Sequence, residues 1–135
     1  MGFIYEERGF MKKVVLIIDD EDLVAKTISR LLTKSGCEVH LCRNGEEALK
    51  KIAAIAFDLL ICDVRMPGLS GIETIKKARA LALSLGRKAS REIVITGYAE
   101  DSAMKEAEQL KVADYIYKPF DLRVFMDAVA RNLSE

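Results

Sequence analysis

The chain is organised around one stretch of sequence, Phe57-Asp58-Leu59-Leu60-Ile61-Cys62-Asp63-Val64-Arg65-Met66-Pro67-Gly68. The run from Phe57 to Cys62 is apolar except for Asp58, and a Pro-Gly turn signal follows it. A short apolar run that ends near a turn signal is typical of a buried strand in a parallel sheet. Asp63 stands where this strand ends. Its carboxylate is therefore predicted to emerge at the carboxyl edge of the sheet, where ligands bind in open α/β folds.

The rest of the chain repeats this pattern on both sides of the central stretch. Apolar runs predict strands at 14–18, 38–42, 57–62, 93–95 and 113–117. Segments with helical apolar spacing follow the strands, and three of them begin with a capping residue, at Asn44, Ser70 and Asp121. Five strands that alternate with five helices predict an α/β fold with one doubly wound parallel sheet, covered on both faces. Residues 1–12 are predicted to be a flexible leader, so the folded domain spans 13–135.

Composition and charge exclude several classes of function. Lys and Arg together number 21, as do Asp and Glu, so no net charge favours nucleic acid or an anionic membrane. A basic stretch from 76 to 91 lacks aromatic platforms and DNA-binding motifs, so direct nucleic-acid binding is not predicted. That stretch is read as a solvated helix face and loop, with docking of an acidic partner as the alternative. No apolar run approaches the roughly 18 residues of a membrane span, and a secretion signal is missing, so a cytoplasmic location without membrane contact is predicted.

Polar side chains end four of the five predicted strands. The first strand ends in Asp19-Asp20, the third in Asp63, the fourth in Thr96 and the fifth in Lys118. The carboxyl ends of parallel strands lie along one edge of a sheet. Three carboxylates, a hydroxyl and an ammonium are therefore expected to converge at this edge and to form a functional site.

The expected cluster suits phosphoryl transfer. Two unit charges about 4 Å apart repel by about 4 kcal/mol at an effective dielectric near 20, so clustered carboxylates need a cation or a proton. A small number of protein ligands, all of them oxygens, favours Mg²⁺, which completes its coordination shell with water and substrate oxygens. With Lys118 available for phosphoryl oxygens and Thr96 as a hydroxyl donor, the residues suit transfer of a phosphoryl group onto Asp63.

At this point the residues resemble a known family, the receiver domain of two-component response regulators. Four motifs carry the resemblance, and they are Asp19-Asp20-Glu21, Asp63 within Asp-Val-Arg-Met-Pro-Gly, Thr96-Gly97 and Tyr115-x-x-Lys118-Pro119-Phe120. The resemblance covers about residues 13–133 and identifies 13–135 as a receiver domain. It implies a flavodoxin-like fold with strand order 2-1-3-4-5. The sequence departs from the family at Gly97, where Ala is commoner, and at Lys111, where Gly is frequent.

The resemblance also implies a role for each residue of the cluster. Asp63 would accept a phosphoryl group from a sensor histidine kinase or a histidine phosphotransfer protein. Asp20, Asp63 and the backbone carbonyl of Arg65 would ligate Mg²⁺ directly, and Asp19 would do so through water. Lys118 would pair first with Asp63 and then with the phosphoryl group, and the bond between Lys118 and Pro119 would be cis.

Further implications concern signalling. Thr96 and Tyr115 match a switch pair that would reshape the face made by the fourth helix, the fifth strand and the fifth helix. That face would bind a downstream protein target or an output domain, or form a phosphorylation-dependent homodimer. The resemblance thus implies a signalling domain, not an enzyme, that assists its own phosphorylation and dephosphorylation.

Other readings stay open at this stage. One is a phosphohydrolase with an aspartyl nucleophile, although the position two residues after Asp63, where such enzymes usually place a second carboxylate, holds Arg65. Another is a receiver domain cut from a longer regulator with an output domain. A flavodoxin-like cofactor binder is disfavoured, because acidic residues 19–22 would repel a phosphate group after the first strand.

Overall fold

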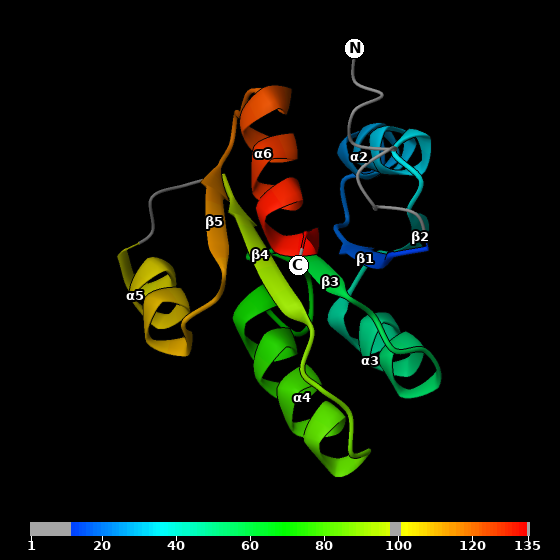
Figure 1. The fold of residues 1–135 in the computed structure, drawn as a ribbon. Coiled ribbons are helices and arrows are strands. Elements are labelled where there is room, and N and C mark those ends of the chain that lie inside the picture. Colours follow the sequence, from blue (N-terminus) through cyan, green and yellow to red (C-terminus); the bar gives the residue numbers. More distant parts are fainter. Residues whose placement is uncertain (1–11, 98–100, 135) are drawn as a thin grey trace.

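The computed structural model of the chain describes residues 12–97 and 101–134 (Figure 1). The strands are β1 (Val14–Ile18), β2 (Glu38–Cys42), β3 (Leu59–Asp63), β4 (Arg91–Thr96) and β5 (Asp114–Tyr117). The helices are α2 (Asp22–Lys34), α3 (Gly45–Ala54), α4 (Gly71–Ser84), α5 (Asp101–Leu110) and α6 (Leu122–Leu133). Except for Lys12, the predicted leader lies outside the described residues.

All strand pairs in the sheet are parallel, and the strand order is β2-β1-β3-β4-β5. The predicted fold class and strand order are therefore confirmed. In the register of the sheet, Ile18 is level with Cys62, and Asp63 is level with Ile95. The residues that directly follow β1, together with the last residues of β3 and β4, consequently meet at one edge.

The central strand begins two residues later than the sequence predicts, at Leu59 instead of Phe57. Asp58, the residue directly before the strand, bonds to the first residue of β1 through both its backbone and its side chain. Its N–H donates to the Val14 carbonyl at 2.8 Å, and its Oδ2 accepts the Val14 N–H at 2.8 Å. Asp58 thus closes the amino end of the strand pair. The apolar run still forms a strand that is buried on both faces.

Two layers of helices cover the sheet. Figure 1 shows α2 and α6 on one face and α3, α4 and α5 on the other. Alternate strand residues supply the two cores, as the two-residue period of a strand requires. Val15 and Ile17 pack with the α2 and α6 side, whereas Leu16 and Ile18 pack with the α3 and α4 side. Among the described residues, no helix has the length and apolar character needed to cross a membrane.

The predicted helix caps are present and fix where three helices begin. Asn44 accepts a hydrogen bond from the Glu47 N–H at 2.9 Å. Ser70 and Glu73 form a reciprocal capping box, with distances of 3.1 Å and 3.0 Å. Asp121 accepts from the N–H of the second residue of α6 at 2.7 Å. Because α4 and α6 follow the loops after β3 and β5, these caps help to hold the site loops in place.

Three of the six basic side chains in the stretch from 76 to 91 make contacts within the fold, whereas Lys77, Lys88 and Arg91 are exposed. Lys76 pairs with Glu106 at 3.8 Å, and Arg79 makes a bidentate pair with buried Glu92 at 2.6 Å and 2.8 Å. Arg87 donates to carbonyl oxygens at the end of α3, at 2.5 Å for Ile52, 3.2 Å for Ala53 and 3.4 Å for Ile55. These contacts bind the α4 layer to its neighbours.

Lys111 has a left-handed backbone conformation, which glycine adopts more readily than lysine. Its φ angle is +56°, and it directly follows the end of α5. Its N–H donates to the Glu108 carbonyl at 3.0 Å, and the next N–H, of Val112, lies 3.4 Å from the Ala107 carbonyl. This is the arrangement in which helices end with a left-handed residue. The turn before β5 therefore has the geometry that a glycine would give it, and the left-handed backbone of Lys111 carries the conformational cost.

Candidate functional site

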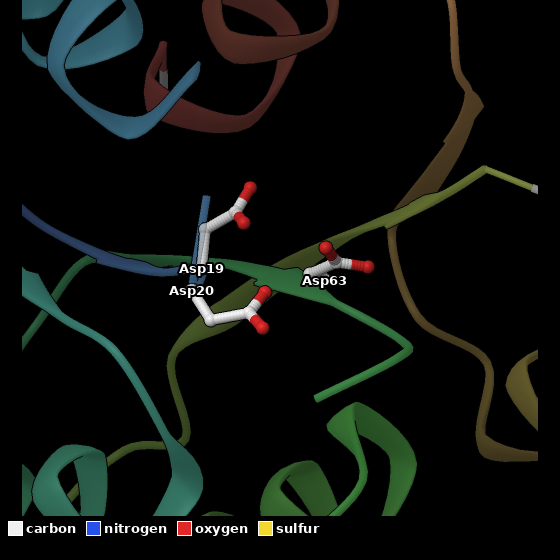
Figure 2. A group of neighbouring side chains, drawn as sticks. All are labelled: Asp19, Asp20 and Asp63. Atoms are coloured by element: carbon white, nitrogen blue, oxygen red, sulfur yellow. The ribbon is translucent and has the colours of Figure 1, made fainter. Parts of the chain in front are cut away.

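The site lies at the carboxyl edge of the sheet, where three aspartates come together. Asp19 and Asp20 follow β1, and Asp63 is the last residue of β3. Figure 2 shows the three side chains next to one another at these strand ends. One carboxylate oxygen from each lies within 4.8 Å of the other two. The convergence that the sequence predicts for these carboxylates is thus present.

Asp19 is the most buried of the three aspartates. Its residue is 2% exposed, its Oδ1 accepts the Glu21 N–H at 2.9 Å, and its Oδ2 is buried without a hydrogen bond. Burial raises the pKa of Asp19 to about 6; the hydrogen bond from Glu21 opposes this rise, and the charge of Asp63 adds to it. A buried carboxylate oxygen without a hydrogen bond is a position where a cation would bind favourably.

Asp63 is held in a defined orientation by one neighbour on each oxygen. The Arg65 N–H donates to its Oδ1 at 3.1 Å, and the Lys118 ammonium donates to its Oδ2 at 3.0 Å. The residue is 5% exposed, yet it lines the hollow described below. The chain therefore presents one oriented carboxylate toward this hollow.

Lys118 connects the aspartates to a fourth acidic residue, Glu21. Its Nζ donates to Glu21 and to Asp63, and it lies 3.9 Å from Asp19 Oδ2. Burial lowers the pKa of Lys118, but hydrogen bonds to Glu21 and Asp63 outweigh it and raise the pKa above its ordinary value. The ammonium is consequently charged at all ordinary pH values.

A hollow of about 710 Å³ opens above these groups. It is lined by Asp20, Glu21, Val24, Asp63, Arg65, Gly97, Lys118, Pro119 and Phe120. The peptide bond between Lys118 and Pro119 is cis. Acidic, basic and apolar residues thus line a space that is large enough for a small anionic group and a hydrated cation.

Comparison with known proteins identifies the family. A family model described as the response regulator receiver domain matches residues 15–130. The chain belongs to this family. The regulatory protein AtoC of Escherichia coli K12 is 37% identical over 108 residues, which cover 80% of this chain and 22% of AtoC. Sporulation initiation phosphotransferase F of Bacillus subtilis is 28% identical over 123 residues, which cover 91% of this chain and 95% of that protein.

Solved receiver structures share the fold. Response regulator protein TrrA of Thermotoga maritima, crystallised with Mg²⁺ and BeF, is 29% identical with a TM-score of 0.76, covering 90% of this chain and 99% of TrrA. The chain spans 22% of AtoC and 51% of CrdR of Helicobacter pylori, another of the regulators that it matches. Receiver domains are signalling domains of two-component systems, and this chain is one of them.

The two predicted switch residues of this receiver domain lie in different surroundings. Thr96 is 2% exposed at the end of β4, and its carbonyl accepts the Lys118 N–H at 2.7 Å. Tyr115 is 37% exposed, and its hydroxyl donates to Glu108 Oε2 of α5 at 3.2 Å. This hydrogen bond raises the pKa of the Tyr115 hydroxyl. The Tyr115 hydroxyl therefore lies against α5, whereas the Thr96 backbone is bonded to Lys118.

Two residues support the site without having been assigned to it from the sequence. One is Glu21, the partner of Lys118. The other is Gly71, the first residue of α4, where an added Cβ would lie 2.2 Å from the Asp63 carbonyl oxygen and 2.9 Å from Val64 Cα. Gly71 thus lets α4 begin directly against the backbone that carries Asp63. The signal available in the sequence was a glycine immediately after the capping residue Ser70.

The donor set of the receiver site fits a hard divalent cation. It offers oxygen ligands from Asp19, Asp20 and Asp63, and it includes the buried Oδ2 of Asp19 that has no hydrogen bond. Mg²⁺ prefers a small number of carboxylate oxygens together with water. The backbone carbonyl of Arg65, predicted as a further ligand, stays a prediction.

Proposed function

We propose that this receiver domain accepts a phosphoryl group on Asp63 from a sensor histidine kinase or a histidine phosphotransfer protein, in a reaction that depends on Mg²⁺. The observation that carries the proposal is the position of Asp63, which lies beside Asp19 and Asp20, accepts a hydrogen bond from the Lys118 ammonium and lines an open hollow. A carboxylate of this kind is both oriented and accessible. Family membership supports the same assignment.

In the proposed reaction an oxygen of the Asp63 carboxylate forms a bond to phosphorus. The bond from phosphorus to the donor histidine nitrogen breaks, and that nitrogen keeps the electron pair. Asp63 reacts as the ionised carboxylate, so no proton has to leave it. Lys118, 3.0 Å from Asp63 Oδ2, is placed to stabilise charge on the phosphoryl oxygens, and the Thr96 hydroxyl is proposed to donate to one of them.

Asp19, Asp20 and Asp63, with the backbone carbonyl of Arg65, are proposed to hold Mg²⁺. When bound there, Mg²⁺ would supply positive charge that offsets both the carboxylates and the phosphoryl oxygens. The buried oxygen of Asp19 without a hydrogen bond supports this assignment from within the chain. The Mg²⁺ and BeF complex of TrrA supports it from a relative.

The output of the domain is proposed to be a change of its protein-binding surface. Phosphorylation would draw the Thr96 hydroxyl toward the phosphoryl group and let Tyr115 leave Glu108 and turn inward. The face formed by α5, β5 and α6 would then change shape and bind a downstream protein, an output domain or a second copy of the chain. Longer relatives such as AtoC and FixJ, whose names mark them as regulatory proteins, support an output domain.

The proposal is tested by incubating the protein with acetyl phosphate and Mg²⁺ and measuring its intact mass. Wild type is expected to gain the mass of one phosphoryl group, and Asp63→Asn is expected to gain none. Asp22→Asn is the matched control, since Asp22 is an exposed aspartate that pairs with Arg43 instead of Lys118. A gain on both wild type and Asp63→Asn, or on neither, would contradict the proposal.

A further inference from the structure

Glu21 is the N-cap residue of α2, but its carboxylate does not cap its own helix. The residue has an extended backbone, with φ of −89° and ψ of 98°, and makes no side-chain cap hydrogen bond. Its carboxylate instead accepts a hydrogen bond from the ammonium of Lys118, 97 residues away in the sequence. The pair joins the turn after β1 to the turn after β5, and both residues line the hollow that contains Asp63.

The Lys118 ammonium has three N–H donors, and three carboxylates face it. It donates to Glu21 and to Asp63 Oδ2 at 3.0 Å, and Asp19 Oδ2 lies 3.9 Å away. A phosphoryl oxygen on Asp63 therefore competes for this ammonium with carboxylates that already surround it. Because the ammonium already donates to Glu21 and Asp63, its movement toward the phosphoryl group would weaken at least one of these contacts.

Exposure decides which carboxylate is released. The Glu21 side chain is 56% exposed, whereas the side chains of Asp19 and Asp63 are 2% and 6% exposed. Water can hydrate Glu21 once Lys118 leaves it, but the buried carboxylates would lose their compensation without gaining water. Glu21 is thus the partner that Lys118 can give up at least cost.

We propose that Glu21 is a positioning residue that holds Lys118 in the unphosphorylated state and releases it to the phosphoryl group on Asp63. This inference rests on the proposed function of Asp63 and adds a residue that sets how readily the reaction occurs. The contact with Glu21 stabilises the starting state more than the transition state, and it therefore slows phosphorylation. The negative charge of Glu21 beside the hollow acts in the same direction on an anionic donor.

The test compares initial rates of phosphoryl uptake from acetyl phosphate in the presence of Mg²⁺. Glu21→Gln keeps the size of the side chain and removes its charge, and it is expected to react roughly two- to fivefold faster, as for the loss of a half-exposed ion pair. Asp22→Asn removes the same charge one residue later, where the partner is Arg43 at 3.6 Å, and is expected to react at nearly the wild-type rate. Equal acceleration in both variants would overturn the proposal.

Two further measurements separate the contact with Lys118 from a general effect of charge. In a Lys118→Met background, Glu21→Gln is expected to lose most of its accelerating effect, and an unchanged effect would contradict the proposal. The Cε resonance of Lys118 in NMR spectra is expected to shift in Glu21→Gln and not in Asp22→Asn. The NMR comparison needs no phosphorylation. A wild type that takes up no phosphoryl group would thus refute the proposed function, while an absent NMR shift would refute the role of Glu21.

Discussion

The carboxyl of Asp19 is expected to destabilise the metal-free protein at neutral pH. Mainly because of burial, its pKa is raised to about 6 from the ordinary value of 3.8. The folded protein therefore holds this proton more tightly than the unfolded chain, so the free energy of unfolding falls as the pH rises through the interval between the two values. The difference between the two pKa values corresponds to about 3 kcal/mol of the free energy of unfolding. This contribution is fully lost once the pH is above the folded-state pKa.

Asp19→Asn removes this ionisation and keeps an oxygen for the Glu21 N–H, which Asp19 Oδ1 accepts at 2.9 Å. The free energy of unfolding of the variant is expected to exceed that of wild type by up to about 3 kcal/mol at neutral pH and to equal it near pH 4. Urea unfolding in EDTA across this pH range measures the difference. Asp22→Asn, at an exposed position, is the control and should stay within about 0.5 kcal/mol of wild type. An Asp19→Asn protein that is no more stable than wild type at neutral pH would show that the Asp19 carboxylate does not destabilise the fold.

Three further perturbations follow from the fold and the site. Millimolar Mg²⁺ should raise the melting temperature, because it binds the folded state preferentially, and an unchanged melting curve would contradict the cation site. Gly71→Ala should lower the free energy of unfolding by about 1–3 kcal/mol through overpacking. The control is Gly97→Ala, which should be tolerated because its Cβ would lie 3.9 Å from Lys118 Cδ. Equal urea midpoints for the two variants would count against the close approach at Gly71. Lys111→Gly should raise the free energy of unfolding by about 0.5–1 kcal/mol, because it relieves a left-handed residue, and a lower urea midpoint would contradict this account.

The positions of strand ends could be predicted because they depend only on patterns along the chain. An apolar run that stops at Asp63 is visible in the sequence, and parallel pairing then brings it to the same edge as Asp19 and Asp20. The starts of α3, α4 and α6 were equally predictable, because a cap such as Ser70 acts on the backbone within the first turn of its helix. Strand ends and helix caps are set by local sequence, and the parallel topology then brings the strand ends to one edge of the sheet.

Contacts that join distant residues could not be predicted in the same way. Whether Glu21 caps its own helix or reaches Lys118 depends on how two loops meet, and nothing local to Glu21 decides it. The outward position of Tyr115 depends on a hydrogen bond to Glu108 on a neighbouring helix. The need for Gly71 depends on how closely α4 approaches β3. Each of these features follows from packing between elements.

We propose that the crowded carboxyl edge makes Asp63 the phosphoryl acceptor of this receiver domain. The most direct test is to map the attachment point after incubation with acetyl phosphate and Mg²⁺, by borohydride reduction and peptide mass analysis. Reduction of an aspartyl phosphate leaves homoserine at that position. Homoserine is expected at position 63 and nowhere else, with none formed in EDTA. Homoserine at another position, or labelling of Asp63 that is unchanged in EDTA, would contradict the proposal.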